Sequence, residues 1–239
     1  MKIQRYPDLE TLSRAAADMF LQMAGKYIAA KGRFAVALSG GNTPRRLYEL
    51  LGTEPYILSI DWNHIHFFWA DERCVSHDHP DSNYRLAFDA FLSKSRVPAE
   101  NIHRINGEEE PEKEAAEYER DIRRFFGERE FPVFDLIILG IGEDGHTASL
   151  FPKSKILYEK NHLAGFVDEK GIKHPRITLT LPVLNRAENV LVLASGKSKA
   201  SVVRKVIDEK DPALPASLLS HGEGTLVFLL DRDAAKLLS

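Results

Sequence analysis

The chain has 239 residues, 44% of them hydrophobic and 28% charged, with a formal net charge of −3 at pH 7. This composition is typical of a globular protein with a sizeable core. The slightly acidic balance argues against nucleic acid as the main partner, because proteins that neutralise phosphate backbones usually have a marked basic excess. Cys74 is the only cysteine, which excludes an intrachain disulfide and a cysteine metal cluster.

The length and the lack of a linker predict a single α/β domain over residues 1–239. The N-terminus has no apolar signal region, and no stretch approaches the ~18 apolar residues of a membrane span. We therefore expect a cytoplasmic protein that does not bind membranes. We also expect a monomer, although none of these patterns determines the oligomeric state.

The first elements are a helix and a strand. Apolar residues recur at helical spacing between Leu9 and Met23, which predicts a helix from Asp8, as its cap, to about Lys31. Residues 34–38 are apolar throughout and predict a buried strand.

A small-residue turn, Ser39-Gly40-Gly41-Asn42-Thr43-Pro44, follows this strand and leads into an amphipathic helix that ends near Leu51. Thr43 is the expected N-cap, with Pro44 at the first helical position. Free backbone N–H groups and the positive end of the helix dipole favour an anion at such a turn. Because no P-loop lysine follows, a single phosphate group fits better than a nucleoside triphosphate, although glycines also occur in such turns for packing alone.

The next predicted strand, residues 65–69, ends at Ala70-Asp71-Glu72-Arg73. This places three charges at the carboxyl end of a buried strand, where open α/β sheets bind ligands. His64 with His66, expected on one face of the strand, and His77 with His79 are possible metal-ligand pairs. Neither pair has a third ligand at local spacing, so we predict no metal.

The middle of the chain contains two further helices. Residues 80–83 lead into a helix with Leu86, Phe88, Phe91 and Leu92 on one face, and residues 102–105 predict a short strand. The acidic run at residues 108–112 suits the start of another helix, which ends near Phe126.

The most informative stretch begins with residues 134–139, an apolar run that predicts the central strand of a parallel sheet. Gly140, Gly142 and Gly145 follow, and His146 comes directly after them. The spacing matches the dinucleotide fingerprint, but Pro152 interrupts the helix that this fingerprint requires, so a nicotinamide cofactor is disfavoured. A structural turn with a solvated histidine is the other alternative.

The last third of the chain predicts three more strands. Residues 153–173 are polar and are a candidate flap, whereas residues 176–181 alternate and predict a strand with a solvent-facing polar side. A buried strand at residues 190–194 precedes a small-residue turn and a helix to about Asp208, and Lys197 in this turn is a candidate second contact for the anion. Residues 225–230 predict the last strand, and Asp231 is expected to cap a short terminal helix.

Several of these segments together resemble the 6-phosphogluconolactonase family, whose members are related to the glucosamine-6-phosphate deaminases. The segments are Ala-Leu-Ser-Gly-Gly-Asn-Thr-Pro at residues 37–44, Trp-Ala-Asp-Glu-Arg at 69–73, Gly-Ile-Gly-Glu-Asp-Gly-His-Thr-Ala-Ser-Leu-Phe-Pro at 140–152, Arg-Ile-Thr-Leu-Thr-Leu-Pro at 176–182, and Gly196-Lys197. The resemblance implies a doubly wound, mostly parallel sheet with helices on both faces, of Rossmann-like type. It also implies hydrolysis of 6-phospho-glucono-1,5-lactone in the oxidative pentose phosphate pathway, with no cofactor.

Lactone hydrolysis needs a base for the attacking water, stabilisation of an oxyanion and a proton for the ring oxygen. His146 is the predicted base and acid, and Asp144 is predicted to orient it, with Asp71 as the alternative. Backbone N–H groups of the Gly142–Gly145 turn are candidates for the oxyanion. For the phosphate we predict the Ser39, Gly40, Gly41, Asn42 and Thr43 turn together with Arg73, Arg176 and Lys197. Ser149 is disfavoured as a nucleophile because it lacks the Gly-x-Ser-x-Gly turn.

Two related functions remain as alternatives. A non-catalytic sugar-phosphate sensor of this fold would need a DNA-binding module, and no basic helix-turn-helix segment is present in the sequence. In the deaminase pattern a glutamate stands five residues after the histidine and assists proton transfer. Phe151 occupies this position here, which favours the lactonase.

Overall fold

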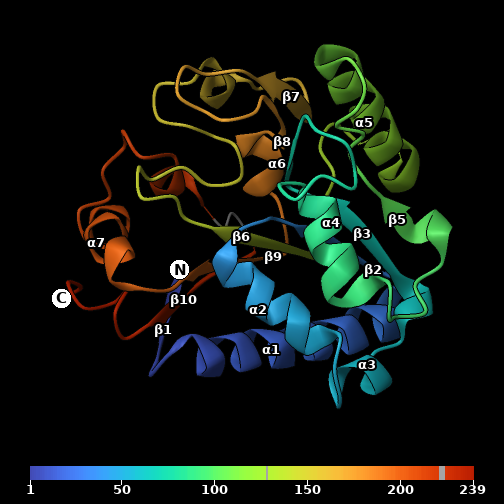
Figure 1. Ribbon diagram of the computed structural model, residues 1–239, viewed down its shortest axis with the longest axis horizontal. Helices are drawn as coiled ribbons and strands as arrows, with labels where there is room; N and C mark the ends of the chain where they lie inside the picture. Colours follow the sequence, from blue (N-terminus) through green and yellow to red (C-terminus); the bar gives the residue numbers. More distant parts are fainter. Residues whose placement is uncertain (128, 221–223) are drawn as a thin grey trace.

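A parallel sheet forms the centre of the fold in the computed structural model (Figure 1). Within residues 1–127, 129–220 and 224–239, which the structure describes, seven strands lie in the order β1-β10-β9-β6-β2-β3-β5, and every neighbouring pair is parallel. The strands are β1 (Lys2–Tyr6), β2 (Phe34–Leu38), β3 (Ile65–Trp69), β5 (Ile102–His103), β6 (Leu136–Gly140), β9 (Asn189–Ala194) and β10 (Thr225–Asp231).

The strand order confirms the predicted doubly wound sheet. From β2 the chain proceeds to β3 and β5 on one side, and later from β6 to β9 and β10 on the other. The predicted central strand, β6, is the middle strand of the seven, and the order reverses between β2 and β6. The edge strand β1 was not predicted, because its sequence, Lys-Ile-Gln-Arg-Tyr, is polar and largely exposed.

Alternate side chains of β3 show why helices cover both faces of the sheet. Phe67 stacks on Phe20 of α1 (Leu9–Lys31), with ring centroids 6.4 Å apart. Phe68 faces the other way and contacts Phe125 of α5 (Pro111–Phe126) at 5.2 Å. Figure 1 shows α1 below the sheet and α5 above it. Because successive strand residues point to opposite faces, one apolar run fills both layers of the core.

Up to residue 210 the helix boundaries agree with the predictions, except at the small-residue turn after β2. Asp8 caps α1 as expected, since its Oδ1 accepts from the Thr11 N–H at 2.8 Å. The predicted Thr43 cap is wrong, because α2 begins at Asn42 and Gly41 precedes it with φ 107°, a conformation that glycine adopts most easily. The other helices are α2 (Asn42–Leu51), α3 (Tyr56–Ser59), α4 (Asn83–Ala87), which continues as a π-helix at Phe88–Leu92, α6 (Leu181–Leu184) and α7 (Ala200–Ile207). Short 3₁₀ turns occur at Trp62–His64, Ala99–Asn101, Lys155–Tyr158, Lys197–Lys199 and Pro215–Leu218.

A small antiparallel sheet lies above the large one in Figure 1 and corrects one prediction. It consists of β4 (Asp71–Arg73), β8 (Arg176–Leu179) and β7 (Ala164–Val167), so the predicted flap at residues 153–173 contains a strand. The polar side of the 176–181 strand is buried rather than solvated: Thr178 and Thr180 have no exposed surface. The Thr178 hydroxyl accepts from the Ser149 N–H at 3.2 Å.

Three smaller predictions also change. His64 precedes β3 in a 3₁₀ turn and contacts Asp61, whereas His66 contacts His103, so the two histidines do not share a strand face. Asp231 accepts from the Ala234 N–H, but the residues after it form turns rather than a helix. Phe88 is 41% exposed instead of facing the core. No helix in the described parts of the chain combines the length and apolarity needed to cross a membrane.

Candidate active site

A cleft of about 580 Å³ opens at the carboxyl ends of β2 and β6, where the strand order reverses. Open α/β sheets bind ligands at such a position because the loops on its two sides diverge. The cleft brings together most of the predicted site residues, namely Ser39, Gly40, Gly41, Asn42, Thr43, Asp71, Arg73, Gly142, His146 and Arg176. They come from four separate segments of the chain, which the order of the sheet places side by side.

His146 lies at one side of the cleft and is held by Asp144. Its Nδ1 is 2.6 Å from Asp144 Oδ1, and the His146 N–H donates to the same oxygen at 3.2 Å. The hydrogen bond from His146 lowers the pKa of Asp144 below its usual value. An ionised carboxylate can only accept a hydrogen bond, so the neutral imidazole of His146 carries its proton on Nδ1. The lone pair on Nε2 is then free to take a proton from a water molecule.

The alternative partner, Asp71, has a different set of contacts. Its carboxylate accepts from the Ser149 hydroxyl at 2.7 Å and from the Asn83 amide at 3.3 Å. Ser149 is 1% exposed, so its hydroxyl is a buried hydrogen-bond donor in this conformation. The structure therefore pairs Asp144, and not Asp71, with the imidazole.

Gly142 and Gly145 form hydrogen bonds within the loop that carries His146. The Gly142 N–H donates to the His146 carbonyl at 2.8 Å, and the Gly145 N–H donates to the Gly142 carbonyl at 3.0 Å. These two N–H groups, predicted as oxyanion donors, are thus engaged within the loop. A Cβ on Gly142 would lie 2.1 Å from His146 Nδ1 and 2.5 Å from Asp144 Oδ1, so the Asp144–His146 contact requires glycine at this position. Residues 141–154 form turns and no helix. A dinucleotide fingerprint needs a helix that begins at its glycines, so this loop does not have that structure.

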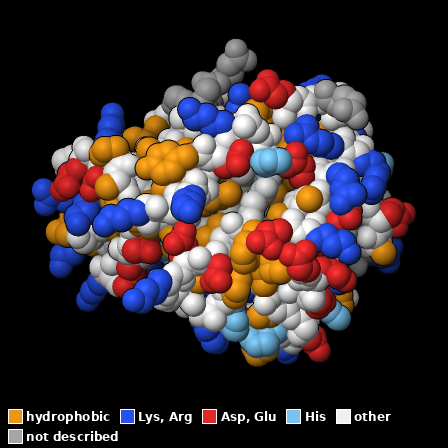
Figure 2. Space-filling model, turned by 90° about the horizontal axis from the view of Figure 1, so that it is seen from above, with side chains coloured by type: hydrophobic (Ala, Val, Ile, Leu, Met, Phe, Trp, Pro, Cys, Tyr) orange, Lys and Arg blue, Asp and Glu red, His pale blue; other side chains and the backbone are white. Residues whose placement is uncertain are grey.

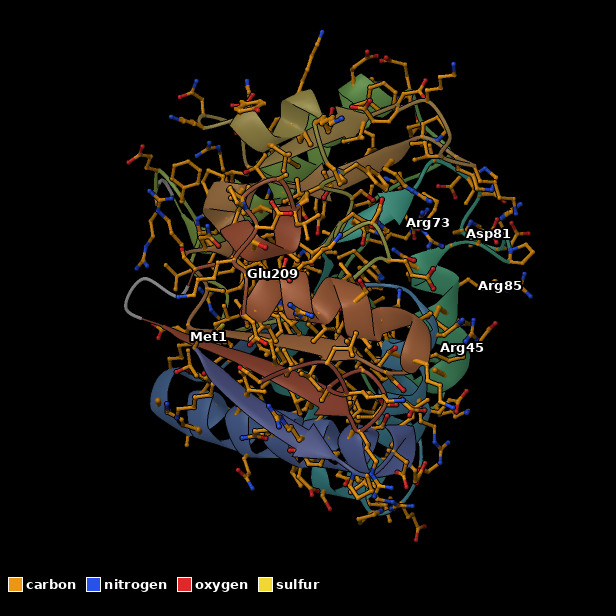
Figure 3. All side chains as sticks on the ribbon, turned by 90° about the vertical axis from the view of Figure 1, so that its left-hand side faces the viewer. Met1, Arg45, Arg73, Asp81, Arg85 and Glu209 are labelled. Carbon is orange, nitrogen blue, oxygen red and sulfur yellow. The ribbon has the colours of Figure 1, made fainter. Side chains whose placement is uncertain are left out.

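Arg73 and Arg176 form a basic wall of the cleft from neighbouring strands, since they are paired in the β4–β8 register. Arg73 Nη1 donates to the Asp81 carbonyl, and Figure 3 shows the two residues close together. Arg73 Nε and Arg176 Nη1 are buried and have no hydrogen-bond partner among the described residues. Burial, and then the charge of Arg73, lowers the pKa of Arg176. Buried unpaired donors of like charge are costly, and a bound anion would satisfy both.

Two buried residues next to the cleft were missed by the sequence prediction. Glu72 accepts from the Asn83 and Tyr84 N–H groups at 2.7 and 2.8 Å and so fixes the start of α4. Asn83 then donates to the Asp71 carbonyl at 2.8 Å and packs against Gly40, where a Cβ would lie 1.8 Å from Asn83 Oδ1. No local pattern shows these contacts, because Gly40 and Asn83 are brought together only by the fold.

In the Gly196–Lys199 turn after β9, a different lysine from the predicted one lines the cleft. Lys197 is exposed and is absent from the cleft wall, whereas Lys199 lines the cleft together with Ser195 and Ser198. The Asp231 carboxylate accepts from the Gly196 N–H at 3.0 Å and from the Ser195 hydroxyl at 2.5 Å, which holds the turn against β10. Both lysines occur in the same Gly-Lys-Ser-Lys run, so the helical phase of the following residues decides which one faces the cleft.

A comparison with known protein families matches residues 7–228 of the chain to the family described as glucosamine-6-phosphate isomerases/6-phosphogluconolactonase. The chain belongs to this family. It is 42% identical over 215 residues to a 6-phosphogluconolactonase of Synechocystis sp., covering 88% of this chain and 87% of that protein. It is 38% identical to a 6-phosphogluconolactonase of Nostoc sp., covering 99% and 98% of the two chains.

A solved structure of a 6-phosphogluconolactonase from Trypanosoma cruzi has a TM-score of 0.88 to this chain. The two are 30% identical, and the similarity covers 100% of this chain and 97% of the other. Membership of the isomerase/lactonase family confirms the resemblance inferred from the motifs. It also agrees with the observed Rossmann-like sheet.

Proposed function

We propose that this chain hydrolyses 6-phospho-D-glucono-1,5-lactone to 6-phospho-D-gluconate, a step of the oxidative pentose phosphate pathway. The observation that supports this most is that one cleft contains both the imidazole of His146, hydrogen-bonded to a carboxylate, and two half-buried guanidinium groups, Arg73 and Arg176, each with one buried, unpaired N–H donor among the described residues. A lactone that carries a phosphate needs a base at one end and cations at the other. The names of the relatives at 42% and 38% identity support the same activity.

In the proposed mechanism His146 acts first as a base and then as an acid. Its Nε2 takes a proton from a water molecule while the water oxygen attacks the lactone carbonyl carbon. The tetrahedral intermediate then collapses, the bond between this carbon and the ring oxygen breaks, and the imidazolium returns its proton to the ring oxygen. Asp144 stabilises the imidazolium through the 2.6 Å contact to Nδ1. A positioned base of this kind contributes roughly 10²–10⁴ to the rate.

The phosphate is assigned to cleft residues that come from segments other than the His146 loop. The Ser39–Thr43 turn offers backbone N–H groups at the start of α2, a ten-residue helix, and its positive end favours negative charge. Arg176 and Arg73 complete the site with side-chain donors, and Lys199 takes the role that the sequence prediction gave to Lys197. Because a phosphate monoester carries about −1.5 to −2 charges near neutral pH, it can offset the repulsion between the two guanidinium groups.

Phe151 favours the lactonase over the deaminase. Its ring lies 4.8 Å from the His146 imidazole, centroid to centroid, and lines the cleft. A phenyl group cannot titrate, so ring opening and hydrogen transfer between sugar carbons would lack an acid–base group at this position. Lactone hydrolysis has no such step, and His146 can supply the base and the acid that it needs.

The proposal also includes a single domain, a monomeric state, a cytoplasmic location and catalysis with no cofactor or metal. Every acid–base and cationic group that the reaction requires comes from this chain. On the face shown in Figure 2, basic and acidic side chains alternate without a broad basic field, which supports a small-molecule substrate rather than nucleic acid. Gel filtration of the purified protein tests the monomeric state.

A lactonase assay with two histidine variants tests the activity and its base together. The lactone is generated in the cuvette, and 6-phosphogluconate is measured after subtraction of spontaneous hydrolysis. We expect turnover by the wild type, little above background for His146→Ala, and unchanged turnover for His162→Ala, whose side chain is 68% exposed beside Glu119. Near wild-type kcat in His146→Ala would show that another group is the base. Absence of wild-type turnover would contradict the activity itself.

A further inference from the structure

Two loops meet beside the cleft at a group of three side chains, His79, Asp81 and His174. His79 and Asp81 lie between β4 and α4, and His174 comes shortly before β8. One potential ligand atom from each residue lies within 4.8 Å of the others, and all three side chains are partly buried. Figure 3 shows Asp81 near Arg73 at the end of β4. The sequence suggested His79 as half of a ligand pair with His77, but the third ligand comes from a loop more than 90 residues away.

Hydrogen bonds link the three side chains directly, and a metal ion would take the place of two of these bonds. His174 Nε2 is 2.8 Å from Asp81 Oδ2, and the Asp81 N–H donates to His79 Nδ1 at 3.0 Å. The Asp81 N–H occupies the lone pair of His79 Nδ1, so His79 exchanges this hydrogen bond for the ion when it binds, and His174 Nε2 exchanges its proton. Asp81 Oδ1 has no hydrogen-bond partner among the described residues. The two imidazole rings lie 5.3 Å apart at 77°, so neither ring stacks over the other.

Asp81 is negatively charged and is neutralised by an exposed lysine. Lys173 Nζ lies 2.5 Å from Asp81 Oδ2, and the Lys173 side chain is 72% exposed. Lys173 and His174 both contact Asp81 Oδ2, and such contacts favour the carboxylate over the carboxylic acid. An exposed lysine contributes little to such a pair and can move into solvent when a divalent cation takes its place. His77, in contrast, contacts Glu108 and lies outside the group.

We propose that His79, Asp81 and His174 bind a divalent transition metal ion of the zinc class, with water completing a four-coordinate shell. Two imidazole nitrogens and one carboxylate oxygen match the ligand preference of Zn²⁺ and Co²⁺, whereas Mg²⁺ and Ca²⁺ prefer oxygen ligands. The site is distinct from the His146–Asp144 pair and is not required for the proposed lactone hydrolysis. Metal binding joins the 74–82 loop to the 168–175 loop and releases Lys173, which lines the cleft, from Asp81.

Metal titration of the complete, untagged chain after EDTA treatment and dialysis tests the site. Zn²⁺ is titrated by calorimetry, and Co²⁺ is titrated by visible absorption, which reports the coordination number. We expect a micromolar or tighter site with the intense bands of four-coordinate Co²⁺. His79→Ala and His174→Ala each remove one ligand and should weaken Zn²⁺ binding by about 100-fold. Losing only the hydrogen-bond partner of a ligand costs roughly 10- to 100-fold, so losing the ligand itself should cost at least the upper value. His77→Ala is the matched control on the same loop and should bind Zn²⁺ as the wild type does.

Two further variants distinguish binding at this group from binding at the catalytic pair and from a loss of folding. His146→Ala should retain the Zn²⁺ affinity; if it abolishes binding while His174→Ala does not, the metal binds at the catalytic pair and the proposal is wrong. His174→Phe keeps a ring in the same space without a ligand atom, so it controls for a loss of folding in the alanine variant. Equal weakening by His77→Ala and His79→Ala, or no micromolar binding by the wild type, would also overturn the proposal.

Discussion

Gly142→Ala tests whether the loop geometry around His146 sets the rate. The new methyl group would lie 2.1 Å from His146 Nδ1, 2.2 Å from its Cε1 and 2.5 Å from Asp144 Oδ1. All three separations are far below van der Waals contact, so the imidazole must leave Asp144 and lose the 2.6 Å hydrogen bond. We expect kcat to fall about 100-fold, or about 2.7 kcal/mol in the activation barrier, because this contact fixes the tautomer and orientation of the base. KM should change little, since Arg73 and Arg176 are on other strands.

Gly140→Ala is the matched control two residues earlier on the same segment. A Cβ at Gly140 would meet no heavy atom within 4 Å, so kcat and KM should remain close to wild type. Both variants are assayed for lactone hydrolysis, and their thermal unfolding is compared to show that the fold is intact. A Gly142→Ala enzyme with wild-type kcat, or equal losses in both variants, would refute the argument from close approach.

Three other predictions concern the cations proposed to bind the phosphate, the dependence of activity on metal, and stability in acid. Arg176→Ala and Lys199→Ala should mainly raise KM for the phosphorylated lactone, whereas Lys197→Ala should change it little; equal effects of the two lysine variants would contradict the assignment of Lys199 to the cleft. Dialysis against EDTA should leave kcat unchanged, and a loss of activity restored by Zn²⁺ would show that metal takes part in catalysis. Burial lowers the pKa of His66 to about 4, so the unfolded chain binds more protons than the native chain between about pH 6.5 and 4, and stability should fall with pH through this window. His66→Gln should reduce this acid sensitivity and His64→Gln should not, as followed by urea unfolding at pH 7 and pH 5.

Local patterns were sufficient for all strands of the large sheet except β1 and for most residues of the cleft. The 34–38 and 134–139 runs are apolar on both faces, which only a buried parallel strand accommodates, and each is followed by small residues that end it. The helix from Asp8 has both a cap and a periodic apolar face. Because the carboxyl ends of parallel strands share one edge of the sheet, the predicted loops had to meet there.

The small sheet and the finer contacts depend on pairings that are distant in sequence. β4 has only three residues, Asp-Glu-Arg, and no strand pattern, yet it pairs with β8 across about 100 residues. That pairing buries Thr178, whose alternation with apolar neighbours is otherwise typical of a half-solvated strand. It also places Arg176 beside Arg73. The contacts of Asn83 with Gly40 and of His174 with Asp81 arise in the same way and leave no local signal.

The central claim is that the cleft hydrolyses a phosphorylated lactone and does not deaminate an amino sugar phosphate. The most direct measurement offers 6-phosphogluconolactone and glucosamine 6-phosphate separately to one preparation and follows acid release and ammonia release. We predict rapid acid release above the spontaneous rate and no ammonia, because Phe151 supplies no acid–base group beside His146. Ammonia release at a rate comparable to acid release would contradict this account.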